Sequence, residues 1–168
     1  MAPFATKISS TVTICAAPPD VWAVLCDLGR YHEWHPHVRE AEGTIKVGNQ
    51  VRFKMAPPCR RPFTIRPKVT AARPGAELRL LGRLPVLFSG EHGFTLNPIG
   101  SGDETEVVQS EIYRGLVVPF IGRTIAATRA EFDEVNQALK HRVEQRASIR
   151  RPEGQSPHSP GTSEDDVG

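Results

Sequence analysis

Hydrophobic and polar residues alternate along most of the chain between residues 7 and 113, a pattern typical of half-buried β-strands. Residues 88–96 show it most clearly, because His92 and Phe94 share one face with the other even-numbered positions while Glu91 and Thr95 share the opposite face. Turn signals rich in glycine, proline and asparagine separate the runs. The pattern therefore predicts about seven strands, at residues 7–16, 38–41, 51–55, 63–69, 78–83, 88–96 and 105–113.

Two helical patterns interrupt and follow these strands. In residues 17–38 the apolar side chains recur at the spacing of one helix face, and the Pro18–Pro19 pair suits a helix start. Gly29 is expected to end this helix in a left-handed cap, and Pro36 to stop a second short turn. The result is a two-helix elbow that carries Tyr31 and both tryptophans.

A long amphipathic helix is predicted from Pro119 to about Arg146. The residues after 147 are almost without apolar side chains and are expected to be disordered. The predicted organisation is an N-terminal extension at 1–6, one α+β domain at 7–147 and a disordered tail at 148–168. A curved antiparallel sheet wrapped around the long helix is the economical packing, and it leaves a cavity for a small ligand between sheet and helix.

Composition excludes few classes of function. The net charge of +2 gives no reason to expect a nucleic-acid partner, although residues 59–90 hold seven basic residues against the single acid Glu77. Solvated strand faces are the favoured interpretation of that basic stretch, and an anionic ligand or membrane surface is the alternative. Three cysteines without metal-type spacing, no secretory signal and no bilayer-length apolar run predict a cytoplasmic protein with free thiols.

His92 and Glu111 are the sharpest candidate pair for chemistry. Each lies on the apolar face of its strand, and the two strands are predicted to form a hairpin in which cross-strand neighbours touch. Such a pair acts in proton transfer or orients a ligand carbonyl, while a merely satisfied buried pair is the competing interpretation. Gln109 is a weaker addition to the same face.

The remaining ligand-binding candidates are apolar. The full set of predicted cavity residues is Tyr31, Trp34, Phe53, Phe63, Ile65, Leu80, His92, Phe94, Gln109, Glu111, Phe132, Val135 and Leu139. His32, His35 and His37 do not share a helix face, so they are expected to be exposed to solvent, and no metal is predicted. No phosphate loop, dinucleotide glycine pattern or hydrolase elbow is present, so no cofactor is expected.

The chain resembles the START-like (Bet v 1-like) helix-grip superfamily, often called SRPBCC, whose members include polyketide cyclase/dehydrase-like and lipid-transfer proteins. The resemblance spans roughly residues 7–147 and rests on segments in order, among them APPDVWAVLCDLGRYHEW, KVGNQV, RPGAELRLLG, FSGEHGFTL and QSEIYRGLVVP. It implies a helix-grip fold that binds a hydrophobic small molecule in a central cavity, with Tyr31 and Trp34 of the elbow at the cavity mouth. The alternative is that these two aromatic residues fill the gap between the elbow and the sheet. The resemblance implies no particular reaction.

The sequence is therefore compatible with three functions. The first is binding of a lipid, polyketide-like or aromatic ligand, with His92, Glu111 and Gln109 fixing its polar group. The second is a polyketide cyclase or dehydratase that uses His92 and Glu111 as its acid and base. The third is a membrane- or protein-binding module that uses the basic stretch at residues 60–83, with transient membrane contact left open.

Overall fold

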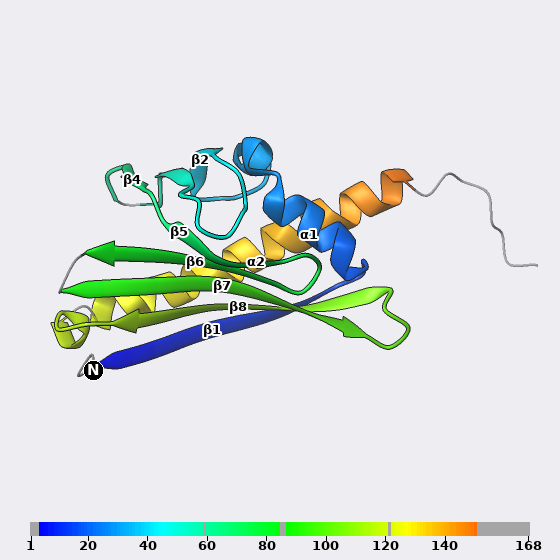
Figure 1. Ribbon diagram of the computed structural model, residues 1–168. Helices are drawn as coiled ribbons and strands as arrows, with labels where there is room; N and C mark the ends of the chain where they lie inside the picture. The colour runs from blue at the N-terminus through cyan, green and yellow to red at the C-terminus, as the bar shows by residue number, and fades with distance from the viewer. Residues whose placement is uncertain (1–3, 59, 85–86, 121, 151–168) are drawn as a thin grey trace, which may run out of the picture.

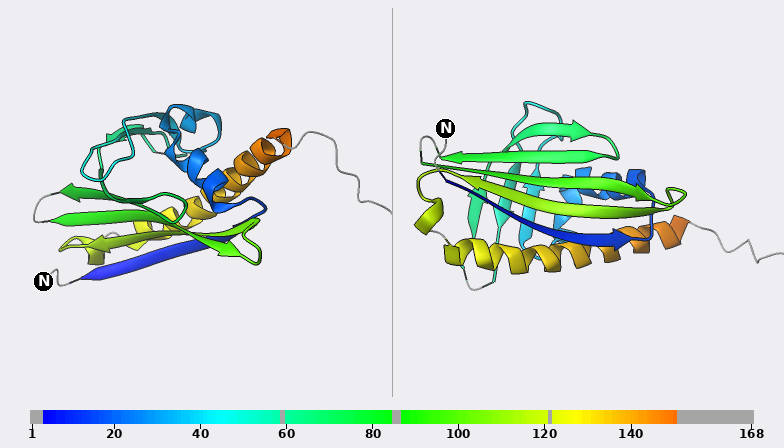
Figure 2. Two further views of the ribbon diagram at one scale, coloured as in Figure 1. Left: turned by 45° about the vertical axis from the view of Figure 1, so that its right-hand side comes forward. Right: turned by 90° about the horizontal axis from the view of Figure 1, so that it is seen from below.

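A computed structural model of the chain describes residues 4–58, 60–84, 87–120 and 122–150. A long helix lies along a curved five-stranded sheet, and a second, three-stranded sheet and the elbow cover the other side of the helix (Figures 1 and 2). The elements are β1 (Ala5–Ile14), α1 (Pro18–Cys26), η1 (Leu28–Glu33), β2 (Val38–Glu42), β3 (Arg52–Met55), β4 (Phe63–Ile65), β5 (Lys68–Arg73), β6 (Glu77–Leu84), β7 (Phe88–Ile99), β8 (Glu104–Arg114), η2 (Val118–Phe120) and α2 (Gly122–Arg150). The predicted α+β helix-grip fold is confirmed.

Every strand pair is antiparallel. The larger sheet has the order β1-β8-β7-β6-β5 and the smaller has the order β2-β3-β4. Main-chain hydrogen bonds join the two sheets at a corner, where the Val51 N–H donates to the Pro67 carbonyl and the Val69 N–H donates to the Asn49 carbonyl. The chain therefore forms one bent wall around a central space.

The structure has one strand more than predicted, because the expected strand at 63–69 is divided. Phe63–Ile65 pairs with β3, whereas Lys68–Arg73 pairs with β6 in the other sheet. Pro67 lies at the break. Proline has no N–H to donate to a strand ladder, so the chain changes sheets at the position where a ladder bond would be missing.

The elbow forms as predicted, apart from its glycine. Helix α1 starts at Pro18 and ends at Cys26, with Asp27 as its C-cap. Gly29 is not in the left-handed region and lies inside the short helix η1, so the prediction that it caps α1 was wrong. The buried Tyr31 hydroxyl donates to the Leu25 carbonyl and thereby ties the two helices together.

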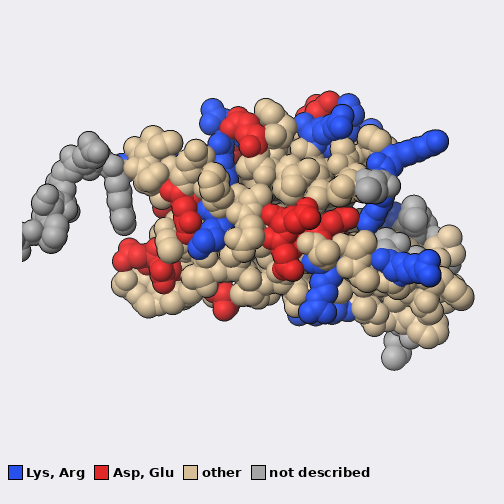
Figure 3. Space-filling view, turned by 180° about the vertical axis from the view of Figure 1, so that it is seen from behind, with Lys and Arg blue, Asp and Glu red and all other residues tan. Residues whose placement is uncertain are grey.

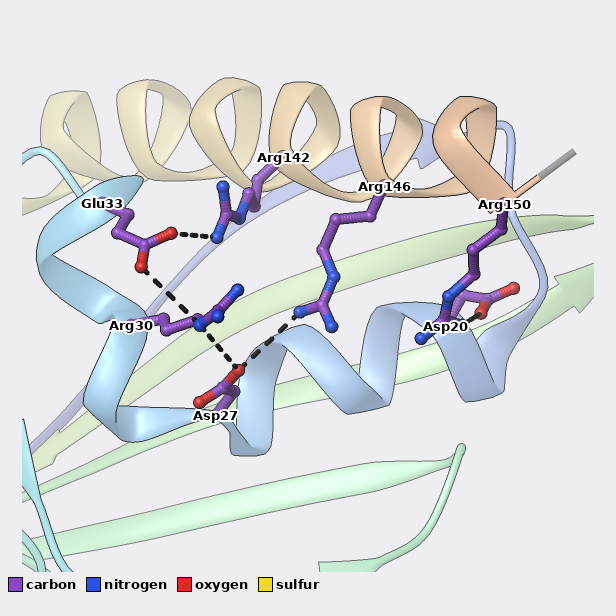
Figure 4. A network of polar contacts seen from close by, with 7 residues as sticks. All are labelled: Asp20, Asp27, Arg30, Glu33, Arg142, Arg146 and Arg150. Carbon is purple, nitrogen blue, oxygen red and sulfur yellow. Dashed lines mark hydrogen bonds and ion pairs between the residues drawn. The ribbon is translucent and has the colours of Figure 1, made fainter. Parts of the chain in front are cut away.

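Ion pairs fasten the elbow to the last turns of α2 (Figure 4). Arg150 pairs with Asp20 at 3.0 Å, Arg146 pairs with Asp27 at 3.8 Å, and Arg142 pairs with Glu33. Exposed pairs contribute up to about 1 kcal/mol each, so the network orients the elbow on α2 more than it stabilises the fold.

Helix α2 follows the edge strand β1. Its side chains reach that strand through Asp133, which accepts from Ser10, and Lys140, which donates to the Thr13 carbonyl. The predicted apolar face is buried at Ile125, Phe132, Val135, Leu139 and Val143, while Ile121 lies outside the described residues.

The predicted domain ends need small corrections. Strand β1 begins at Ala5, inside the predicted N-terminal extension, and α2 runs to Arg150, three residues into the predicted tail. The helix begins at Gly122 rather than at Pro119, since η2 occupies residues 118–120. The rest of the predicted tail, at 151–168, lies outside the described residues.

Candidate functional site

A cavity of about 640 Å³ lies between α2, the larger sheet and the β2–β4 layer. Eleven of the thirteen predicted ligand-binding residues line it: Tyr31, Phe53, Phe63, Ile65, Leu80, His92, Phe94, Gln109, Glu111, Phe132 and Val135. The strand periodicity was sufficient to find most of these residues, because side chains two apart on a strand share a face.

The two predicted residues that do not line the cavity are packed elsewhere. Trp34 contacts Tyr31, with ring centroids 5.0 Å apart, and supports the cavity wall from behind. Leu139 is fully buried in the core cluster. Both positions match an apolar pattern, and such a pattern does not distinguish the lining of a cavity from the core beside it.

The sheet supplies a polar group of side chains to the cavity. Strands β7 and β8 place His92 opposite Glu111 and Phe94 opposite Gln109, as the predicted hairpin required. His92 Nδ1 lies 3.7 Å from Glu111 Oε2, and His92 Nε2 lies 3.4 Å from the Gln109 amide nitrogen. The contact between His92 and Gln109 is within hydrogen-bonding range, whereas the distance between His92 and Glu111 is longer than that of a normal hydrogen bond.

Aromatic edges hold the His92 ring in place. The rings of Phe94 and Phe132 meet it nearly perpendicularly, at centroid distances of 5.1 and 5.4 Å. Perpendicular contacts of this kind are favourable for aromatic rings. The imidazole is therefore fixed between an apolar wall and its polar neighbours.

Tyr113 extends the polar group along β8. Burial, and next the charge of Glu111, raise the pKa of the Tyr113 phenol, so this group stays protonated. Gly90 lies opposite Tyr113 in the sheet, and a Cβ atom there would lie 3.0 Å from Glu111 Oε1. Glycine at this position leaves space for the carboxylate.

His35 and His37 also line the cavity. The prediction that they are exposed was wrong for both, since His37 is buried and His35 is half-buried. The His35 ring stacks on Tyr31 at 5.7 Å, and its Nδ1 accepts the main-chain N–H of His37 at 3.1 Å. Only His32 is exposed, as predicted. No periodic pattern marks these two residues, because they lie in the turn between η1 and β2.

His35 is held in its neutral form. Burial, together with the neighbouring His37 and His92, lowers the pKa of His35 to about 3. Because Nδ1 accepts a hydrogen bond, the single proton of the neutral ring lies on Nε2. His35 thus presents a fixed N–H donor on the cavity wall.

Two buried side chains of the cavity have polar atoms without hydrogen-bond partners among the described residues. The Gln109 side-chain oxygen has none among the described residues, and neither ring nitrogen of His37 makes a bond of good geometry there, although His37 Nε2 lies 3.3 Å from Glu134. A buried unsatisfied group costs about 1–3 kcal/mol. A polar ligand group or water would recover that cost.

The cavity opens at its arginine-rich end. Six lining residues are exposed, namely Arg60, Phe63, Thr64, Ile65, Arg66 and Arg83, and we call this set the mouth. None of them belongs to the elbow, whose lining residue Tyr31 is buried, so the expectation that the elbow lies at the cavity mouth was wrong. Arg60 reaches across to α2 and pairs with Glu131 at 2.9 Å. Sequence reasoning placed these arginines in one basic stretch. In the structure the stretch divides, since Arg73 and Arg79 pair with Glu77 on the outer sheet face instead.

Acid is expected to destabilise the fold through His35. In the unfolded chain the His35 imidazole takes up a proton near pH 6.5, but in the folded chain it does so only near pH 3. A fall in pH from 6.5 toward 3 therefore favours the unfolded state. From pH 7 to pH 5 this residue should remove about 2 kcal/mol of unfolding free energy, measured by urea unfolding.

The His35→Phe variant keeps the ring stacking and should lose that pH dependence. A His32→Phe variant is the matched control, because His32 is exposed. Equal pH dependence in the wild type and His35→Phe would contradict the assignment of a buried neutral imidazole.

Two further features bear on the class of protein. No described helix combines the length and apolarity needed to cross a bilayer. Within the described ranges, no three His, Cys, Asp or Glu side chains are grouped so that they could hold a metal ion.

The comparisons with solved structures show the same fold. A START superfamily protein from Mycobacterium smegmatis is 19% identical and has a TM-score of 0.64, covering 83% of this chain and 97% of its own. The Zhui aromatase/cyclase from a Streptomyces species is 14% identical with a TM-score of 0.68, covering 86% and 96%. A protein of unknown function from Staphylococcus aureus is 10% identical with a TM-score of 0.70, covering 86% and 97%.

Sequence comparison gives the family. No curated protein matches the sequence significantly. The family model described as "Polyketide cyclase / dehydrase and lipid transport" matches residues 5–144, which include every strand, the elbow and most of α2. The chain therefore belongs to the polyketide cyclase/dehydrase and lipid transport family.

Proposed function

We propose that this protein binds a largely apolar small molecule, with one hydrogen-bonding group, in the cavity between the sheet and α2. The observation that supports this most strongly is the combination of a 640 Å³ apolar space with buried polar groups on its walls. Family membership supports the same class of ligand at a coarser level.

The size of the cavity suits a ligand of a few fused rings or a short lipid. Ligand pockets commonly have volumes of about 300–1,000 Å³ and have mostly apolar walls with a few polar groups. Phe53, Leu80, Phe94, Phe132 and Val135 provide such walls here. Removing apolar ligand surface from water would supply most of the binding free energy.

The polar groups define the chemistry of the ligand's polar end. His35 offers an N–H donor, and the Gln109 side-chain oxygen is an acceptor without a partner. A phenol, enol or alcohol both donates and accepts, so it satisfies both groups at once. A hydrocarbon would displace water from the cavity and leave the His35 and Gln109 groups without hydrogen-bond partners, so binding of a hydrocarbon is disfavoured.

A ligand pair that differs by one hydroxyl tests this proposal. The wild type should bind a fused-ring phenol more tightly than its parent hydrocarbon, and Gln109→Leu should reduce that preference about tenfold. Both affinities can be measured by competition against a fluorescent apolar probe.

The matched control is Phe94→Leu, at the position opposite Gln109 in the sheet. It should weaken the phenol and the hydrocarbon equally, because it removes only apolar contact. If Gln109→Leu instead weakened both ligands equally, the assigned polar end would be wrong.

A cyclase or dehydratase is the second candidate function. The arrangement of His92, Glu111 and the protonated Tyr113 around one part of the cavity favours it, since a base and an acid then face the same ligand atoms. Conversion of a bound ligand, detected as a change in its mass or absorbance, would favour the enzyme over the binder.

A further inference from the structure

The cavity mouth lies at a strongly basic end of the molecule. Five described segments contribute to this end, 60–67, 82–84, 87–90, 112–120 and 122–130, and all five supply cavity-lining residues. Together they contain seven arginines and no aspartate or glutamate. In Figure 3 the right-hand end shows Lys and Arg, whereas Asp and Glu gather in the middle and toward the left.

Most of these arginines are free to bind an external anion. Arg60 pairs with Glu131. Within the described part of the chain, no acidic side chain pairs with Arg61, Arg66, Arg83, Arg114, Arg123 or Arg129. Guanidinium groups bind phosphates with two parallel hydrogen bonds, so such a surface is complementary to phosphate-bearing partners.

Exposed apolar side chains occupy the same end. Phe120 is 86% exposed, Leu87 50% and Leu116 48%. The loops that carry them are adjacent, because a Cβ atom on Gly115 would lie only 2.2 Å from the Leu87 carbonyl oxygen. Large apolar side chains that cluster on a surface mark an interaction site more often than isolated ones do.

We propose that this end of the molecule docks on an anionic lipid bilayer, with the arginines at the headgroups and Phe120, Leu116 and Leu87 inserted among the acyl chains. Basic and apolar side chains act together in this way on interfacial proteins. The mouth residues Phe63 and Ile65 would then face the bilayer, so an apolar ligand would reach the cavity without crossing bulk water.

The form of the surface favours a bilayer over a protein partner. The three apolar side chains project from two separate loops, and Phe120 is almost wholly uncovered. In the described part of the surface these three side chains line no pocket or groove that could hold a helix, which is one usual means of peptide recognition. A fluid apolar phase accommodates separate projecting side chains without shape complementarity.

Vesicle binding of the ligand-free protein tests the inference independently of the proposed function. Co-sedimentation should show binding to phosphatidylcholine vesicles that contain phosphatidylglycerol, weaker binding to pure phosphatidylcholine, and loss at high salt. Phe120→Ser should weaken binding about tenfold. The double variant Arg114→Gln/Arg123→Gln should weaken it by at least about tenfold, since each basic residue contributes about fivefold.

The matched controls are exposed residues that do not line the cavity. Ile149 is 78% exposed near the other end of α2, and Lys46 is exposed, so Ile149→Ser and Lys46→Gln should bind vesicles as the wild type does. Thermal unfolding of each variant checks that these surface changes leave the fold intact.

Four results would overturn the inference. The first is that the wild type does not bind anionic vesicles, and the second is that Phe120→Ser and Ile149→Ser weaken vesicle binding equally. The third is that the protein binds polyaspartate as tightly as it binds anionic vesicles, whether or not Phe120 is present, and the fourth is that the wild type is a dimer which Phe120→Ser dissociates. The third result would indicate an acidic macromolecule as the partner, and the fourth a second copy of this chain. Ligand affinity is measured separately, so a failure of docking leaves the proposed function standing.

Discussion

A Gly82→Phe variant should lose ligand binding at least about 100-fold, which corresponds to about 2.7 kcal/mol, while it remains folded. Gly82 lies on the cavity face of β6, two residues from Leu80, so the new ring would project into the cavity. The backbone has space for it, because the nearest heavy atom to an added Cβ is the Gly90 carbonyl oxygen at 3.8 Å. Phenylalanine is also a better strand residue than glycine.

The matched control for Gly82→Phe is Leu81→Phe, on the opposite face of the same strand. Residue 81 pairs with Glu91, on the outer side of the sheet, and does not line the cavity. Affinities for the fluorescent apolar probe should be unchanged in Leu81→Phe. Undiminished probe binding by a folded Gly82→Phe protein would show that the ligand binds elsewhere.

Leu139→Ala should lower the free energy of unfolding by about 3 kcal/mol and leave ligand affinity nearly unchanged. Leu139 is fully buried among the core residues between α2 and the elbow and makes no contact with the cavity. Its truncation removes transfer free energy and leaves a void that the packed surroundings fill only in part. Urea unfolding at pH 7 measures the loss.

Val135→Ala is the comparison for Leu139→Ala, one helical turn earlier on the same face of α2. Val135 lines the cavity, so its truncation should cost less stability and should change ligand affinity. If both variants lost stability and affinity to the same extent, the distinction between core and cavity lining would not hold.

The fold and the sheet side of the cavity could be predicted from the sequence because both depend on local periodicity. Alternation along β7 and β8 placed His92, Phe94, Gln109 and Glu111 on one face, and a short hairpin loop set their register. This prediction needed only the local pattern of each strand and the order of the strands along the chain, and no knowledge of contacts between distant segments.

The other side of the cavity could not be predicted in this way. His35 and His37 lie in a turn, where no periodic pattern indicates burial. His35 packs against its near neighbour Tyr31, and His37 lies against α2, which is about 100 residues away in the sequence. The same holds for Arg60, which pairs with a residue 71 positions later in the chain. A proline within a predicted strand, as at Pro67, indicates an edge or a bulge. It does not indicate that the chain changes sheets there, as the structure shows.

Native mass spectrometry after incubation with a mixed library of lipids and fused-ring aromatics tests the central claim most directly. The predicted result is a complex of one chain with one mostly apolar molecule that carries a hydroxyl or similar group, formed by the wild type and Leu81→Phe but not by Gly82→Phe. Recovery of only the unliganded mass from the folded wild-type protein, across the whole library, would contradict the proposal that this cavity binds such a ligand.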